Sequence, residues 1–201
     1  MEIYAAVQPL VPTREAYQMM YGEDDPEELS IMQLQDKEVA ERISSVLRDL
    51  YFMESNFDQP REGEGLSETI GTAEDLLELR RIAAAEHGKT PDDYQGGGVP
   101  VGFQFNHLIN HADDEGYYLP VDFPQAFFVE EISIGSAVAL LGEMDALESV
   151  LAAQFPGEVA LALSTPDDEE RVQLNGPVGV WHALRRLCRS AIELDMPIHL
   201  G

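Results

Sequence analysis

The chain has 201 residues and carries 38 acidic but only 12 basic side chains, a formal net charge of −26. Its apolar fraction of 44% is ordinary for a globular protein, and we expect residues 1–201 to form a single domain. This charge disfavours nucleic acid and anionic membranes as partners because both would repel it, and no run of about 18 apolar residues is long enough for a transmembrane helix.

The N-terminal residues and the single cysteine predict a cytoplasmic protein. Residues 1–7 lack the basic start of a secretory signal, and Gln8 and Pro9 interrupt the apolar run that follows. Cys188 has no partner for an intramolecular disulfide, which fits a reducing compartment. Because Cys188 lies in an amphipathic helical pattern, we expect it to be a buried, inert thiol.

The spacing of apolar residues predicts a helix-rich α+β domain with a few short strands. A strand is expected at Tyr4–Val7, and Thr13 is placed to cap a short helix that stops at Gly22. Four longer helices are predicted near residues 36–53, 72–87, 136–155 and 177–194. Thr72 with Asp75 resembles a capping box, and Ser136 is placed to cap the third of these helices.

The intervening segments predict loops and short elements. We expect an exposed loop at 55–66, a glycine-rich loop at 95–100, a buried strand at 159–163, a short helix at 165–174 and an extended tail after Pro197. The glycine triplet at 96–98 does not predict a phosphate-binding loop, because no Gly-Lys-Ser/Thr follows it and Pro100 removes a backbone amide.

His107 and His111 are the two histidines at helical i, i+4 spacing, which would direct both imidazoles to one side of a helix over 105–112. Asp113 or Asp114 would complete a set of two histidines and one carboxylate for zinc or non-haem iron. Leu108 stands where a hydrolytic zinc helix has its glutamate, so no general base is present. We therefore favour a structural role for both histidines, with a divalent metal at His107, His111 and Asp113 as the alternative.

The same stretch resembles an EF-hand calcium loop over twelve residues, with Gly116 as the turn glycine and ligand positions at His111, Asp113, Glu115 and Asp122. It departs from that pattern because the first ligand is not a carboxylate, the last is not a glutamate and Pro124 prevents an exiting helix. The simpler interpretation is a helix end followed by a tight turn with Gly116 at positive φ.

No residue is assigned a catalytic role and no cofactor is expected. Ser133 and Ser136 lie outside any Gly-x-Ser-x-Gly pattern, so neither is predicted to be an esterase nucleophile. Residues 171–201 are slightly positive because of four arginines, namely Arg171, Arg185, Arg186 and Arg189. We interpret them as a solvated helix face, with anchoring of an acidic segment of this chain or of a second copy as the alternative.

Aromatic residues gather between Phe103 and Phe128, with no basic residue among them. Platforms for stacked nucleic-acid bases normally combine aromatics with arginine or lysine, so these residues are not predicted to form one. We expect them to fill the core between helices, with some lining a groove or pocket beside His107 and Asp122 as the alternative.

The composition favours a non-enzymatic interaction protein of the bacterial cytoplasm. In size and charge the chain resembles immunity and inhibitor proteins and mimics of DNA charge, and a basic protein such as a nuclease toxin or a DNA-binding protein is the expected partner. The alternatives are a metal-binding protein or metal-dependent enzyme built on His107 and His111, and a domain whose acidity serves only solubility or adaptation to salt.

Overall fold

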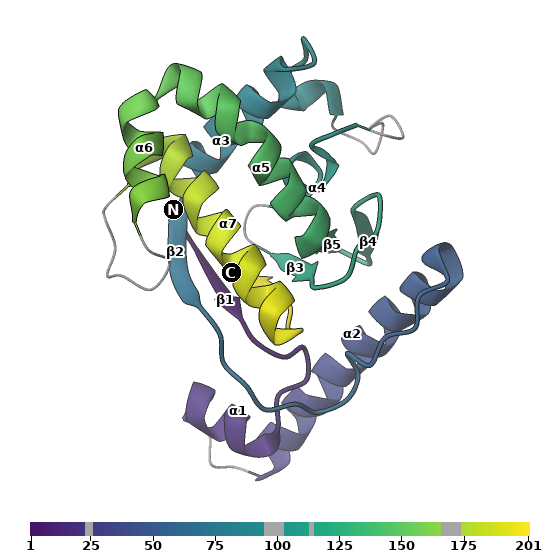
Figure 1. Ribbon diagram of the computed structural model, residues 1–201. Helices are drawn as coiled ribbons and strands as arrows, with labels where there is room; N and C mark the ends of the chain where they lie inside the picture. Colours follow the sequence, from purple (N-terminus) through teal and green to yellow (C-terminus); the bar gives the residue numbers. More distant parts are fainter. Residues whose placement is uncertain (23–25, 95–102, 113–114, 166–173) are drawn as a thin grey trace.

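The computed structural model describes residues 1–22, 26–94, 103–112, 115–165 and 174–201. They form helices and a six-stranded mixed sheet, which confirms the predicted α+β class (Figure 1). The strands are β1 (Glu2–Val7), β2 (Ser67–Thr72), β3 (Gly116–Leu119), β4 (Phe127–Val129), β5 (Ile132–Ser136) and β6 (Ile198–Leu200). The α-helices are α1 (Arg14–Tyr21), α2 (Pro26–Tyr51), α3 (Ala73–Ala85), α4 (Asn106–Ile109), α5 (Ala137–Gln154), α6 (Pro156–Ser164) and α7 (Gly176–Leu194). A 3-10 turn, η1, covers Pro91–Tyr94.

The sheet joins the two ends of the chain. Its strand order is β2-β1-β6-β3-β5-β4, in which β3 and β5 are parallel and the other neighbours are antiparallel. The C-terminal strand β6 lies between β1 and β3, with Ala6 opposite His199. Strands β2 and β4 form the two edges of the sheet.

Two hydrophobic cores lie on opposite faces of the sheet. Helices α3, α5 and α7 contribute to the larger core, where Trp181 is fully buried and its Nε1 donates to the Met144 carbonyl oxygen at 2.7 Å. Helix α2 contributes Ile43 and Leu47 to the smaller core. Tyr118 belongs to the larger core and its neighbour Leu119 to the smaller one, as expected because successive side chains of a strand point to opposite faces.

Three of the four predicted helices, α3, α5 and α7, have nearly the expected bounds, and side-chain caps mark the starts of α3, α5 and the short helix α1. Thr72 and Asp75 form a complete capping box at α3. The Ser136 hydroxyl accepts from the Ala139 amide at 3.0 Å at the start of α5. Thr13 caps α1, which ends at Gly22 with φ of 63°, a left-handed conformation that suits glycine. Local polar groups therefore determine where these helices begin and end.

Helix α2 begins ten residues earlier than the helix predicted at 36–53. Pro26 occupies its first position, and Glu27 and Glu28 follow in the first turn, where acidic side chains are favourable. Helix α1 packs against α2, and the Tyr17 hydroxyl of α1 donates to the Asp36 carboxylate. Within the added residues, the Gln33 side chain donates to the Pro12 carbonyl oxygen at 3.2 Å and Leu29 is buried, so this part of the helix is also held by contacts with the rest of the chain.

The strand predicted at 159–163 is wrong, because these residues belong to helix α6. Pro156 starts the helix, and Val159 and Ala162, three residues apart, are the buried positions. Leu161 and Leu163 are exposed, so the run is not buried on both sides as a central strand would be. The apolar run by itself did not distinguish a helix from a strand. The short helix predicted at 165–174 falls almost entirely outside the described residues.

The segment at 55–66 contains no helix, and its backbone pairs with the segment that follows β1. The Arg61 amide donates to the Val11 carbonyl oxygen at 3.0 Å, and the Thr13 amide donates to the Arg61 carbonyl oxygen. The glycine-rich segment at 95–100 lies outside the described residues. None of the described helices has the length and apolar character needed to cross a membrane.

The aromatic residues at 103–128 are divided between the cores. Phe105 and Tyr118 are buried in the larger core, and Phe123 is buried in the smaller one. The Phe123 ring stacks on the Tyr51 ring, with the two ring centroids 5.4 Å apart. Phe128 is exposed. Most of this group therefore fills the core, as expected.

Candidate interaction surface

Most of the twelve basic side chains form ion pairs with acids of the same chain. The paired residues are Lys37, Arg42, Arg48, Arg61, Arg81, Arg185 and Arg186. Arg80 is buried and donates to the carbonyl oxygens of Leu108 and His111. Little positive charge remains to offset the acids that face the solvent, so the surface of the described residues is predominantly negative.

Two arginines of α7, Arg185 and Arg186, are held in ion pairs with acids of the same chain. Arg185 is only 14% exposed, pairs with Asp145 at 2.8 Å and Glu148 at 3.0 Å on α5, and lies 5.3 Å from the centre of the Trp181 ring. Arg186 approaches Glu68 on β2 at 3.6 Å, and both side chains are largely buried. The solvated helix face predicted for these residues is therefore wrong for Arg185 and Arg186, which anchor acids of the same chain, whereas Arg189 is exposed. Arg171 lies outside the described residues.

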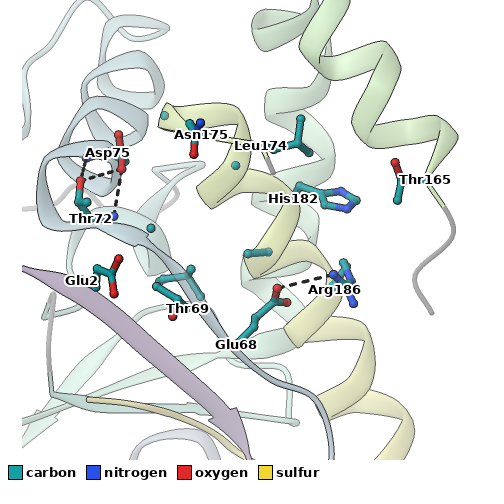
Figure 2. A pocket seen from close by; sticks show the side chains of 15 residues that line it. Glu2, Glu68, Thr69, Thr72, Asp75, Thr165, Leu174, Asn175, His182 and Arg186 are labelled. Carbon is teal, nitrogen blue, oxygen red and sulfur yellow. Dashed lines mark hydrogen bonds and ion pairs between the residues drawn. The ribbon is translucent and has the colours of Figure 1, made fainter. Parts of the chain in front are cut away.

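A groove of about 360 Å³ lies between the edge strand β2 and helix α7 (Figure 2). Its polar lining includes Glu2, Glu68, Asp75, His182 and Arg186. Asp75 accepts from the Thr72 amide at 3.0 Å and from the Thr72 hydroxyl at 2.7 Å, and Glu68 faces Arg186. These carboxylates are therefore engaged in a helix cap and in an ion pair, and the groove shows no assembled catalytic set among the described residues.

His107 and His111, for which a structural role was favoured and metal binding was the alternative, are both buried, but they do not share a helix. Helix α4 ends at Ile109, so His111 lies beyond it. The Ser136 amide donates to His107 Nδ1 at 3.0 Å, and burial lowers the pKa of His107 to about 4. Asp113 and Asp114 lie outside the described residues. Among the residues that are described, no three His, Cys, Asp or Glu side chains are grouped to hold a metal ion.

The His111 ring is packed closely against Tyr118 and against backbone carbonyl oxygens. Its ring stacks on Tyr118 with centroids 3.9 Å apart, and its Nδ1 and Nε2 lie 3.0 Å and 3.1 Å from the carbonyl oxygens of Ala112 and Tyr117. Burial lowers the pKa of His111 to about 4. Gly116, next to it, has the positive φ expected from the sequence. Cys188 is fully buried, and burial raises the pKa of its thiol, so the expectation of an inert cysteine is confirmed.

Glu143 and Arg80 are buried charged residues that the sequence reasoning did not select. Glu143 accepts from the amides of His107 and Leu108 at 2.8 Å each, and burial raises its pKa to about 8. Arg80 binds the carbonyl oxygens at the other end of the same short helix. The sequence feature that could have identified Glu143 as a buried residue is its position within the apolar stripe of α5, between Leu140 and Leu147. Both residues organise the fold and face no pocket described here.

The fold and the surface define an acidic, helix-rich α+β protein whose role is interaction with other proteins. The chain belongs to the family described as "Putative DNA-mimic protein", whose model matches residues 23–200. No curated protein and no solved structure matches the chain.

This family corrects the partner expected from the sequence. The partner expected from the sequence was a basic protein chosen for its charge alone, with a nuclease toxin and a DNA-binding protein as examples, whereas the description of the family as a DNA mimic indicates proteins that bind DNA.

Proposed function

We propose that this protein is a DNA mimic that occupies the DNA site of a DNA-binding protein and so keeps DNA from binding there. The observation that carries the proposal is the division of charge in the fold. Most lysines and arginines pair with acids of the same chain, and Arg185 and Arg186 are largely buried in such pairs, while acids such as Glu38, Asp49 and Glu62 are exposed. The family to which the chain belongs supports the same conclusion.

The physical basis is the charge of the duplex. DNA carries about one negative charge per 1.7 Å of its axis, and its binding proteins present lysine and arginine to the phosphates. A folded surface with a surplus of carboxylates attracts the same groups and steers association over long range, more strongly at low salt. A cytoplasmic location is part of the proposal, because the partners would be proteins of the bacterial chromosome.

Competition with DNA tests the proposal. DNA-binding proteins from the cells that make this chain would be purified on immobilised double-stranded DNA and mixed with a labelled duplex. We expect the chain to release the duplex from at least one of them, with loss of the effect as salt rises. Excess duplex should in turn release the chain from that partner.

The matched control is polyglutamate at the same concentration of negative charge. If polyglutamate displaces the duplex equally well, the chain acts as a simple polyanion and the proposal is wrong. A ternary complex of partner, duplex and chain would also contradict it, because a mimic and DNA compete for one site.

A further inference from the structure

The outward face of α2 carries one straight line of exposed side chains. Neighbours on a helix face are three or four residues apart, and exposed positions follow this spacing from Glu27 through Ile31 and Leu34 to Glu38, and again from Ser45 to Asp49. The step from Glu38 to Ser45 is seven residues, and the exposed Arg42 beside it pairs with Glu130. The opposite side of the helix buries Ala40, Ile43 and Leu47 in the smaller core. Figure 1 shows α1 and α2 together on the side of the molecule away from α3 and α6. This line is called the α2 stripe below.

The N-terminal half of the α2 stripe has an apolar centre with an acid on each side. Ile31 and Leu34 are 55% and 58% exposed, three residues apart, and they lie between Glu27 and Glu38. Single exposed aliphatic residues are common, but a pair on one helix face flanked by charge resembles a protein interface, with an apolar centre and a polar rim. Glu38 and Asp49 form no ion pair within the described part of the chain.

The spacing of the acids identifies the kind of partner. Glu27, Glu38 and Asp49 are eleven positions apart, which at 1.5 Å per residue is about 16.5 Å for each step and about 33 Å in all. One turn of B-DNA is about 34 Å long, and each of its two phosphate backbones passes a given side of the duplex once per turn. Seen from one side, a phosphate backbone therefore passes at a mean interval of about 17 Å along the axis. The three carboxylates therefore match successive crossings of the phosphate backbone over one turn.

We propose that the α2 stripe is the surface that replaces DNA in the partner's DNA site. The carboxylates occupy the places of phosphates, and Ile31 with Leu34 contacts apolar side chains of the DNA-binding protein between them. This inference rests on the proposed function and adds the surface that performs it. A second copy of the chain is a poorer occupant, because it would bring one acidic stripe against another.

Variants matched in net charge test this assignment. Glu38→Gln with Asp49→Asn removes two negative charges from the stripe, and Glu74→Gln with Glu158→Gln removes two from α3 and α6. The readout is the concentration of chain that displaces labelled duplex from the purified partner found by competition. We expect the stripe variant to need about tenfold more chain than the wild type, which is about 1.4 kcal/mol, and the control less than about twofold more.

A second pair of double variants tests the apolar centre of the α2 stripe. Ile31→Ala with Leu34→Ala should weaken displacement by at least about fivefold, whereas Leu161→Ala with Leu163→Ala, exposed leucines of α6, should leave it unchanged. Circular dichroism and thermal melting establish that each variant is folded.

The possible outcomes separate the two proposals. If the wild-type chain displaces DNA from no DNA-binding protein, the proposed function fails and the α2 stripe fails with it. If the wild type displaces DNA but the stripe and control variants behave alike, only net charge matters and the α2 assignment is wrong while the function stands. If sedimentation shows a dimer that Ile31→Ala with Leu34→Ala dissociates, the stripe binds a second copy and the assignment is also wrong.

Discussion

Glu143 and Arg80 hold opposite ends of the four-residue helix α4. The Glu143 carboxylate accepts from the amides of His107 and Leu108, and the Arg80 guanidinium donates to the carbonyl oxygens of Leu108 and His111 at 2.8 Å and 2.6 Å. Backbone groups at helix ends lack partners within the helix, and here two buried side chains from α5 and α3 supply them. The pair thereby attaches the segment around α4 to the larger core.

Glu143→Ala should therefore destabilise the protein. The substitution leaves two amides without acceptors, and each buried unsatisfied donor costs about 1–3 kcal/mol. Urea denaturation followed by circular dichroism measures the loss. Glu148→Ala, on the same helix, is the control, because a partly exposed ion pair contributes about 0–1 kcal/mol. Equal losses for the two variants would show that Glu143 makes no special contribution.

The pH dependence of stability provides a second test of Glu143. Burial raises its pKa to about 8, from 4.5. Between these values the folded chain binds a proton that the unfolded chain has lost, so the free energy of unfolding decreases as pH rises, by at most about 1.4 kcal/mol per pH unit. We expect this decrease between pH 6.5 and 8, and a smaller slope for Glu143→Gln. A slope that the substitution leaves unchanged would contradict the assignment.

The buried histidines predict the opposite trend in acid. Burial lowers the pKa of His107, His111 and His199 to about 4, below the value of 6.5 for a free side chain. Between these values the unfolded chain binds the extra protons, so stability decreases as pH falls from 6.5 towards 4. His111→Gln should reduce the slope of unfolding free energy against pH by the contribution of at most one bound proton. Denaturation at pH 4.5, 5.5 and 6.5 measures this slope. An unaltered slope in this variant would show that His111 does not titrate with folding.

The Glu68–Arg186 ion pair joins β2 to α7 beside the groove of Figure 2. Arg186→Met should cost about 3–5 kcal/mol, because it leaves a buried carboxylate without this partner. The double variant with Glu68→Leu should be less destabilised than Arg186→Met alone, since no unpaired charge remains. Arg81→Met, which breaks the exposed pair with Glu78, should cost less than about 1 kcal/mol. A double variant as unstable as the sum of the single ones would exclude coupling between Glu68 and Arg186.

The sequence determined the features that depend on near neighbours in the chain. Apolar spacing located the helices at 72–87, 136–155 and 177–194, because each helix must bury one face. The side chains of Thr72 and Ser136 marked the starts of the first two, and Thr13 marked the start of the short helix α1, because each accepts from an amide three residues away. The sign and excess of the charge also came directly from composition. That excess favoured interaction with a basic protein but left a metal-dependent role and an adaptation to solubility or salt as alternatives.

The tertiary structure decided what depends on distant residues. Strand β6 pairs with β1 across almost the whole chain, with Leu200 opposite Ala5, and no local pattern encodes that pairing. Arg185 and Arg186 form part of an internal ion-pair network only because α7 packs between α5 and β2. The exposed line on α2 is likewise defined by which side the smaller core covers. Composition determines that the surface must be acidic, but packing determines which acids remain outside and how far apart they stand.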